Sequence, residues 1–131
     1  MEPEILVDTR LAACETIVRE LNRKGFPVVD ASWLKETDGK RWYLYLVSPV
    51  VDAKGSLAAY DELGQLFRDV APAWVGPFDV KLVGTGHRVA KTIAELSHRY
   101  PVPGGARFRE EVVFGGVPVD EALVYGPQLT P

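Results

Sequence analysis

The sequence predicts one α+β domain over residues 1–131, a mixed five-stranded sheet with three helices packed on it as a two-layer sandwich. Segments with a helical repeat alternate with β-rich segments in the order α-β-β-α-β-α-β-β. The bends at Asp38-Gly39 and Gly115-Gly116 each join two β-rich segments and predict antiparallel hairpins. Helical crossovers before and after the third strand predict parallel pairing as well.

The first half of the chain is expected to form a helix followed by a hairpin. Asp8 or Thr9 can cap the helix, and Gly25 is placed to end it. Residues 27–37 and 40–48 are rich in β-branched and aromatic side chains and form the two strands. Asp-Gly suits the bend between them because a type I′ turn needs a positive φ at both central positions.

The second half predicts two more helices and three more strands. Ser56 can cap a helix that Pro72 closes, and residues 77–84 form the third strand. A third helix follows, with apolar residues at i, i+4, i+7 and i+11: Val89, Ile93, Leu96 and Tyr100. Residues 106–114 and 117–125 then form the closing hairpin.

The composition restricts the class of protein. A content of 47% hydrophobic and 25% charged residues is typical of a globular domain, and the net charge of −3 argues against nucleic acid as the main partner. Cys14 is the only cysteine, which excludes an intramolecular disulfide or a thiolate metal cluster within the chain. The longest apolar run, residues 42–51, is half the length of a membrane helix. We therefore expect a soluble cytoplasmic protein with no cofactor.

The glycine bend before the third helix is similar to a phosphate-binding loop, although it fails the requirements of both common types. In a Walker A loop the lysine directly follows the second glycine, whereas Ala90 precedes Lys91 here and Gly84 lies one position too far away. In a dinucleotide-binding turn a glycine or alanine allows close packing of helix and strand, and Val89 stands at that position.

A simpler anion site remains a hypothesis at the same bend. Thr85 is expected as the N-cap, with Gly86 beside it. The N–H groups at the helix start, together with Arg88 and Lys91, could bind a phosphate, sulfate or carboxylate. The alternative is a solvated helix end whose two basic side chains point into water.

The closing hairpin places four acids on two neighbouring rungs. Counted outward from the second glycine bend, the predicted pairs are Phe114–Val117, Val112–Val119, Phe108–Leu123 and Ala106–Tyr125. The same count sets Glu110 opposite Glu121 and Glu111 opposite Asp120. Such carboxylates could share a proton for acid–base catalysis or bind a metal ion. Alternatively, they form an ordinary ion network with nearby arginines, or a register shift separates them.

The first hairpin predicts an aromatic face. Counted from Asp38-Gly39, one side carries Leu34, Tyr43, Tyr45 and Val47. If all three helices cover the other side of the sheet, this face is open, and its mixture of tyrosine and aliphatic residues is typical of protein interfaces. We expect it to bind a protein partner or a second copy of the chain. The alternative is that one helix covers it.

The tail of the chain resembles that of a group of known proteins. The pattern G-V-x-(I/V)-(D/E)-(D/E)-A-x-(I/V)-Y is met by Gly116, Val117, Val119, Asp120, Glu121, Ala122, Val124 and Tyr125. It is similar to the closing hairpin of short, uncharacterised bacterial α+β proteins. The resemblance implies a small bacterial domain and brings no assigned activity.

These observations favour a non-enzymatic protein-interaction module that associates with itself or a protein partner through the aromatic face. The alternative is a small enzyme or a metal- or anion-binding protein. That alternative uses Glu110 and Glu121 with their acidic neighbours, or the helix start from Thr85 to Lys91. His87 and His98 belong to no recognisable catalytic motif.

Overall fold

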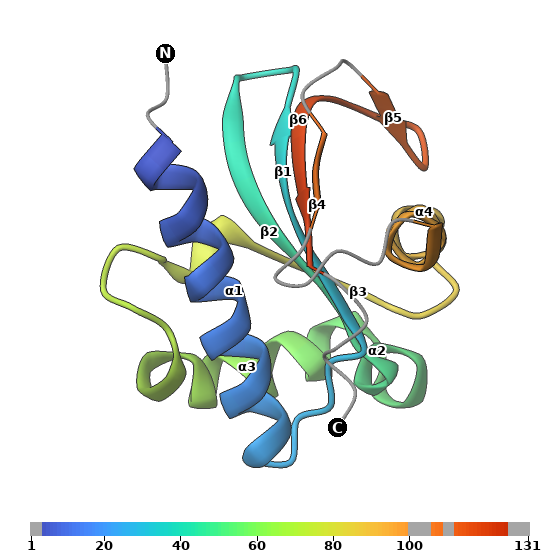
Figure 1. The fold of residues 1–131 in the computed structure, drawn as a ribbon. Coiled ribbons are helices and arrows are strands. Elements are labelled where there is room, and N and C mark those ends of the chain that lie inside the picture. Colours follow the sequence, from blue (N-terminus) through green and yellow to red (C-terminus); the bar gives the residue numbers. More distant parts are fainter. Residues whose placement is uncertain (1–3, 100–105, 109–111, 126–131) are drawn as a thin grey trace.

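The computed structural model describes residues 4–99, 106–108 and 112–125, and Figure 1 shows their arrangement. The elements are α1 (Glu4–Arg23), β1 (Asp30–Glu36), β2 (Arg41–Val47), α2 (Pro49–Lys54), α3 (Ser56–Val70), the 3₁₀ turn η1 (Pro77–Asp79), β3 (Val80–Val83), α4 (Arg88–Arg99), β4 (Ala106–Phe108), β5 (Val112–Phe114) and β6 (Val117–Val124). The α+β class and the mixed sheet are confirmed.

The sheet has the strand order β3-β2-β1-β6-β4, with β5 also paired to β6. Only β2 and β3 run parallel, and the other neighbours are antiparallel. Because β4 and β5 both pair with β6, they are two pieces of the one strand predicted over residues 106–114. The closing strand β6 therefore lies between this strand and β1, and β1 is the central strand of the sheet.

The short helix α2 is one that the sequence interpretation did not include. Its start is nevertheless encoded locally, since the Ser48 side chain accepts a hydrogen bond from the Val50 N–H (3.1 Å) and Pro49 occupies the first helical position. Gly55, at φ +86°, follows its last residue. The Ser-Pro pair was therefore an overlooked helix-start signal.

The register of the first hairpin is confirmed over its whole length, from Glu36 opposite Arg41 to Asp30 opposite Val47. The bend itself differs from the prediction. Positive φ angles occur at Gly39 (85°) and Lys40 (53°), one residue later than expected. The loop thus shifts its left-handed positions without changing which side chains face each other.

The second hairpin is confirmed only near its bend. Gly115 and Gly116 both have positive φ, and the pairs Phe114–Val117 and Val112–Val119 are as predicted. Farther out, Phe108 faces Ala122 and Ala106 faces Val124, so the predictions of Leu123 and Tyr125 as their partners are wrong. The chain advances four positions from Phe108 to Val112 but three from Val119 to Ala122. The count from the bend is therefore off by one residue at β4.

Helices lie on both sides of the sheet, as Figure 1 shows: α1 and α3 on one side and α4 on the other. Alternate residues of β1 and β2, such as Trp33 and Leu44, pack with α1 and α3. The opposite residues pack against the apolar stripe of α4, which includes Val89 and Ile93. Among the helices in the described residues, none is long and apolar enough to cross a membrane.

The bend of the second hairpin fixes the start of α4. A Cβ atom at Gly115 would lie 2.5 Å from the Arg88 carbonyl carbon and 2.5 Å from the Val89 nitrogen. Only a glycine allows such a close approach of two backbones, and its φ of +56° also favours glycine. Sequence reasoning gave this glycine a role in the turn, and the structure adds a role in helix packing.

Candidate functional site

A cleft of about 500 Å³ is lined by all three tryptophans of the chain, Trp33, Trp42 and Trp74. Trp33 and Trp42 come from the side of the first hairpin that faces α1, and Trp74 comes from the loop between α3 and η1. The indole rings of Trp33 and Trp74 are stacked, with centroids 5.9 Å apart and an interplanar angle of 16°. We call this feature the tryptophan cleft.

The guanidinium group of Arg10 lies among the three indole rings. Its central carbon is 5.0 Å from the ring centroid of Trp33, 4.8 Å from that of Trp42 and 5.7 Å from that of Trp74. The Trp33 indole N–H also donates a hydrogen bond to the Arg10 carbonyl oxygen (2.8 Å). Cation–π attraction and this bond together hold α1 against the hairpin.

The sequence contained a signal for this arrangement that was not recognised. Arg10 is spaced four, seven and eleven positions before Cys14, Ile17 and Leu21, so it lies on the buried stripe of α1. An arginine on an otherwise apolar stripe needs a partner within the fold. Trp74 could not have been assigned, because it lies in a loop without periodicity.

Two ion pairs form the rim of the cleft. Arg41 donates a hydrogen bond to Asp79 (2.7 Å), and Lys40 donates one to Asp120 (2.6 Å). Partial burial alone would raise the pKa of Asp79. The hydrogen bonds from Arg41 and from the Gly76 N–H, together with the nearby charges of Arg41 and Arg10, outweigh this effect of burial. The pKa of Asp79 therefore lies below its ordinary value. The hydrogen bonds from Lys40 and then Thr37 likewise lower the pKa of Asp120.

The predicted aromatic face is not open. Leu34, Tyr45 and Val47 are 0%, 3% and 2% exposed and pack beneath α4, while Tyr43 is partly buried at the margin of the same cluster. The prediction of a docking face at these residues is therefore wrong, and the alternative of a covering helix is confirmed. The amphipathic stripe of α4 had to be buried somewhere, and this face is where the topology places it.

Tyr43 and Tyr45 instead belong to a partly buried polar group that we call the tyrosine cluster, together with Lys81 and Glu36. The Lys81 ammonium lies 2.8 Å from Glu36 Oε2, 4.2 Å from the Tyr43 ring centroid and 5.6 Å from that of Tyr45. The Tyr45 hydroxyl donates to the same Glu36 oxygen (2.7 Å). Burial first, and then this bond, raise the pKa of Tyr45 well above its ordinary value.

The predicted anion site has a different geometry from the expected one. The cap of α4 is His87, whose Nδ1 accepts the Val89 N–H (3.1 Å), so the prediction of Thr85 as N-cap is wrong. Thr85 donates both its N–H (3.0 Å) and its hydroxyl (2.7 Å) to Asp52 of α2, an internal carboxylate in the place expected for an external anion. The remaining predicted residues are exposed: Gly86, Arg88 and Lys91.

The acidic rungs receive no support as a site. Glu110 and Glu111 lie outside the described residues, so their predicted positions opposite Glu121 and Asp120 stay predictions. Asp120 bonds to Lys40 and Thr37, and Glu121 stands opposite Lys35 of β1. Within residues 4–99, 106–108 and 112–125, no three side chains of His, Cys, Asp or Glu are grouped to hold a metal ion.

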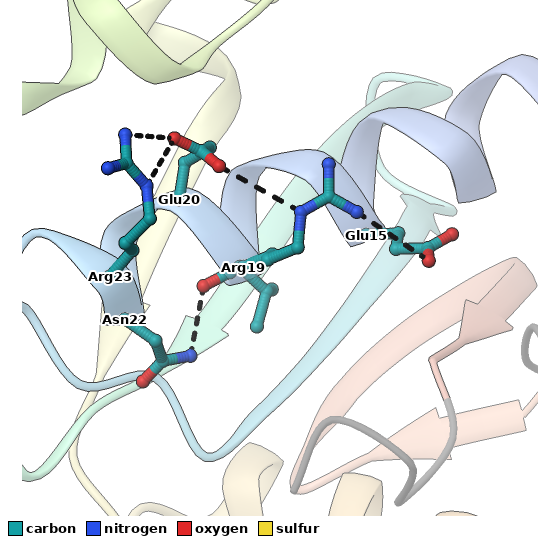
Figure 2. A network of polar contacts seen from close by, with 6 residues as sticks. Glu15, Arg19, Glu20, Asn22 and Arg23 are labelled. Atoms are coloured by element: carbon teal, nitrogen blue, oxygen red, sulfur yellow. Dashed lines mark hydrogen bonds and ion pairs between the residues drawn. The ribbon is translucent and has the colours of Figure 1, made fainter. Parts of the chain in front are cut away.

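The exposed side of α1 carries the other prominent polar network, shown in Figure 2. Arg19 lies 3.9 Å from Glu15 and 3.8 Å from Glu20, and Arg23 bonds to Glu20 at 2.8 Å. These charges are balanced and solvated, and pairs of this kind contribute little to binding or stability. The tryptophan cleft is therefore the stronger candidate site.

Comparison with known proteins provides no relative from which a function could be transferred. The chain matches no protein-family model, no curated protein and no solved structure. The resemblance of the tail to short bacterial proteins stays a prediction.

Proposed function

We propose that this protein is a non-enzymatic binding module that takes a protein partner in the tryptophan cleft. The observation that carries the proposal is the collection of three tryptophans and two arginines around one cleft of about 500 Å³. Tryptophan and arginine are the residues most enriched at the energetic centres of protein interfaces. Protein binding is the function expected from the sequence, now assigned to a different surface.

The cleft is rigid enough to serve as a preformed surface. Trp33 is 1% exposed and stacks on Trp74, which is itself 47% exposed and presents its outer part to solvent. Arg10 lies among the rings and fixes their positions. A partner that binds a surface already in place loses less conformational freedom, so more of its contact energy appears as affinity.

The chemistry of the lining favours binding over catalysis. Of the described residues that line the cleft, Asp79 is the one carboxylic acid, and Arg41 holds it in its ionised form with a lowered pKa. A general base works best with a pKa near the working pH, and this carboxylate is far below it. The remaining side chains of the lining are three indoles, two guanidinium groups and one lysine, which suit the positioning of a ligand.

The test uses the position of the tryptophans. Because all three line the cleft, intrinsic tryptophan emission reports on this site alone. A displayed library of random peptides is selected on the protein, and tryptophan-free binders are titrated while emission is followed. We expect a shift in emission on binding and a loss of affinity in Trp74→Ala. Peptides that bind Trp74→Ala and the wild type equally would contradict the proposal.

Light scattering distinguishes a separate partner from a second copy of the chain. If two copies occupy each other's clefts, the wild type sediments and scatters as a dimer, and Trp74→Ala is a monomer. A monomeric wild type that binds peptides places the partner in another protein.

A further inference from the structure

We infer that the segment bound in the tryptophan cleft is acidic, with carboxylates on the rim cations and an apolar side chain against Trp74. The inference rests on the proposed function and adds the chemistry of the partner. It is carried by the charges of the cleft, by the position of Arg10 and by the exposed rings of Trp74 and Phe78.

The cleft is basic in a protein that is acidic overall. Of the described residues that line it or form its rim, Arg10, Lys40 and Arg41 are cationic and Asp79 and Asp120 are anionic, whereas the whole chain has a net charge of −3. Charges of one sign in a cleft with low-dielectric walls concentrate the electrostatic potential there. The indole walls supply such a medium, and the exposed cationic groups of Lys40 and Arg41 attract an approaching carboxylate.

Arg10 excludes the ligand that a tryptophan cage would otherwise select. Three indole faces around one cavity are the usual recognition site for a cation. Here the guanidinium of Arg10 already occupies that position, within 6 Å of every ring centroid. A lysine or a quaternary ammonium from a partner would meet both a filled cage and a like charge, which leaves anionic and apolar groups as the ligands that fit.

The rim cations are ordered and still accessible. The side chains of Lys40 and Arg41 are 64% and 51% exposed, and each is held by one carboxylate of the chain. Arg41 also lies over the Tyr43 ring, with its central carbon 5.0 Å from the centroid. A guanidinium has five N–H donors in a planar fork and can bind a further carboxylate beside Asp79. The entropy of ordering these long side chains has thus been lost before a partner arrives.

The apolar part of the ligand has a defined place. The exposed portion of Trp74 lines the cleft, and Phe78, which is 85% exposed, follows four residues later in η1, next to Asp79 of the lining. Large exposed aromatic side chains at a cleft mark an interaction surface. An aromatic or aliphatic side chain flanked by acids would bury area on Trp74 while its neighbours reach Lys40 and Arg41.

A basic and aromatic surface also suits single-stranded nucleic acid, and the geometry favours a peptide. Nucleic-acid sites stack successive bases on successive exposed rings along a positively charged groove. Trp33 and Trp42 are buried, so Trp74 is the one cleft tryptophan that offers an open ring surface. The acidic character of the whole chain opposes an extended polyanion more strongly than a short acidic segment.

The experiment examines the composition of the selected peptides and their dependence on charge. Peptides are selected on the wild-type protein and counter-selected on Trp74→Ala. We expect the enriched sequences to carry Asp or Glu around an apolar residue. The tightest tryptophan-free peptide is then synthesised with its acids and with Asn or Gln in their place, and both are titrated by tryptophan emission at low and high salt. The acidic form should bind about tenfold or more tightly, with the difference reduced by salt.

Matched variants test whether the rim cations Lys40 and Arg41 bind the acids of the peptide. Lys40→Gln and Arg41→Gln should each weaken the acidic peptide by about two- to fivefold, as for exposed charge pairs. The controls are Lys54→Gln and Arg99→Gln, which remove equally exposed cations paired with Glu62 (2.8 Å) and Glu95 (2.7 Å) away from the cleft. Equal weakening by the controls would overturn the inference.

The other outcomes separate this inference from the proposed function. If the enriched peptides are neutral or basic but still require Trp74 for binding, the inference of an acidic partner is wrong and the proposal of a binding module is retained. A failure to enrich any peptide that requires Trp74 would overturn both. A thymidine oligonucleotide that displaces the acidic peptide and binds more tightly would replace the peptide with nucleic acid as the ligand class.

Discussion

The two sides of the first hairpin each have cations stacked on aromatic rings, but they differ in how far these groups are open to solvent. On one side Arg10 lies among the indoles of the tryptophan cleft, which opens to solvent at Trp74. On the other side Lys81 of the tyrosine cluster lies over two phenol rings and is neutralised by Glu36, in a cluster packed against α4. The cation–aromatic contact thus stabilises the fold in the tyrosine cluster, whereas in the tryptophan cleft it is also part of an accessible surface.

The difference between the two regions comes from exposure to solvent. The tyrosine cluster brings one cation, one carboxylate and a buried hydroxyl together, so its polar groups satisfy one another. In the tryptophan cleft the rim cations Lys40 and Arg41 are paired with Asp120 and Asp79 but stay 64% and 51% exposed, and Trp74 is 47% exposed. An aromatic–cation group therefore indicates a binding site only where its cations and at least one ring remain within reach of solvent.

Replacing the buried and the exposed member of the stacked tryptophan pair should give the largest contrast. Trp33→Ala removes a fully buried ring and its bond to Arg10, and should lower the free energy of unfolding by about 3–5 kcal/mol. Trp74→Ala should cost about 1–2 kcal/mol, since roughly half of that ring is already exposed. Denaturant unfolding followed by circular dichroism measures both. Equal losses would mean that Trp74 belongs to the core and that the cleft is not a preformed surface.

Helix α4, which packs over Tyr45, contacts the bend of the second hairpin, and this contact can be tested by substitution. Gly115→Ala introduces a Cβ that collides with the backbone at Arg88 and Val89, whereas Gly116→Ala meets nothing within 4 Å. Both positions have positive φ, so both variants lose about 1–2 kcal/mol from backbone strain. Gly115→Ala should lose roughly 1–3 kcal/mol more because of the collision. Equal thermal midpoints for the two variants would show that α4 is not held by this bend.

Sequence reasoning predicted most of the fold, because the features that determine it are local. The Asp-Gly and Gly-Gly bends set the register of each hairpin close to the turn, and the periodic helices α1, α3 and α4 were all expected. The error at Phe108 arose where the count from the bend is off by one residue. Such an irregularity has no local signal, because its effect depends on the partner strand.

The site could not be predicted in the same way, because it depends on tertiary placement. Trp33 and Trp42 lie on the side of the hairpin that faces α1, and their contact with Arg10 and Trp74 joins α1, β1, β2 and a loop. The aromatic face was misjudged because periodicity gives the apolar stripe of α4 without telling which side of the sheet it covers. Alternation along a strand identifies two faces and leaves open which of them meets solvent.

The burial of Tyr45 in the tyrosine cluster predicts that folding stability decreases at high pH. The pKa of Tyr45 is raised in the folded protein, first by burial and then by its bond to Glu36, so folding stability is full below the ordinary value of 10.0 and decreases as the pH rises above it. Ultraviolet absorbance of tyrosinate should show Tyr45 ionising late, together with unfolding. Tyr45→Phe should remove this late ionisation and cost about 1 kcal/mol at neutral pH.

Glu36→Gln serves as the control for that titration. It keeps the side chain's size and removes the charge that disfavours tyrosinate, so Tyr45 should ionise at a lower pH while burial keeps its pKa above the ordinary value. An unchanged titration in Glu36→Gln would mean that the cluster is open to water and would remove the contrast between the two sides.

The smallest expected effect concerns the rim of the tryptophan cleft at low pH. The pKa of Asp79 is lowered in the folded protein, so its contribution to stability is complete above the ordinary value of 3.8 and is lost as the pH falls through the lower folded value. Asp79→Asn keeps an oxygen for the Gly76 N–H and removes the charge that faces Arg41. Because Arg41 is half exposed, solvent screening limits the loss at neutral pH to about 0.2–1 kcal/mol. The unfolding curves of wild type and variant should converge below the ordinary pKa, and a constant difference at every pH would mean that the Asp79–Arg41 pair does not order the rim through its charge.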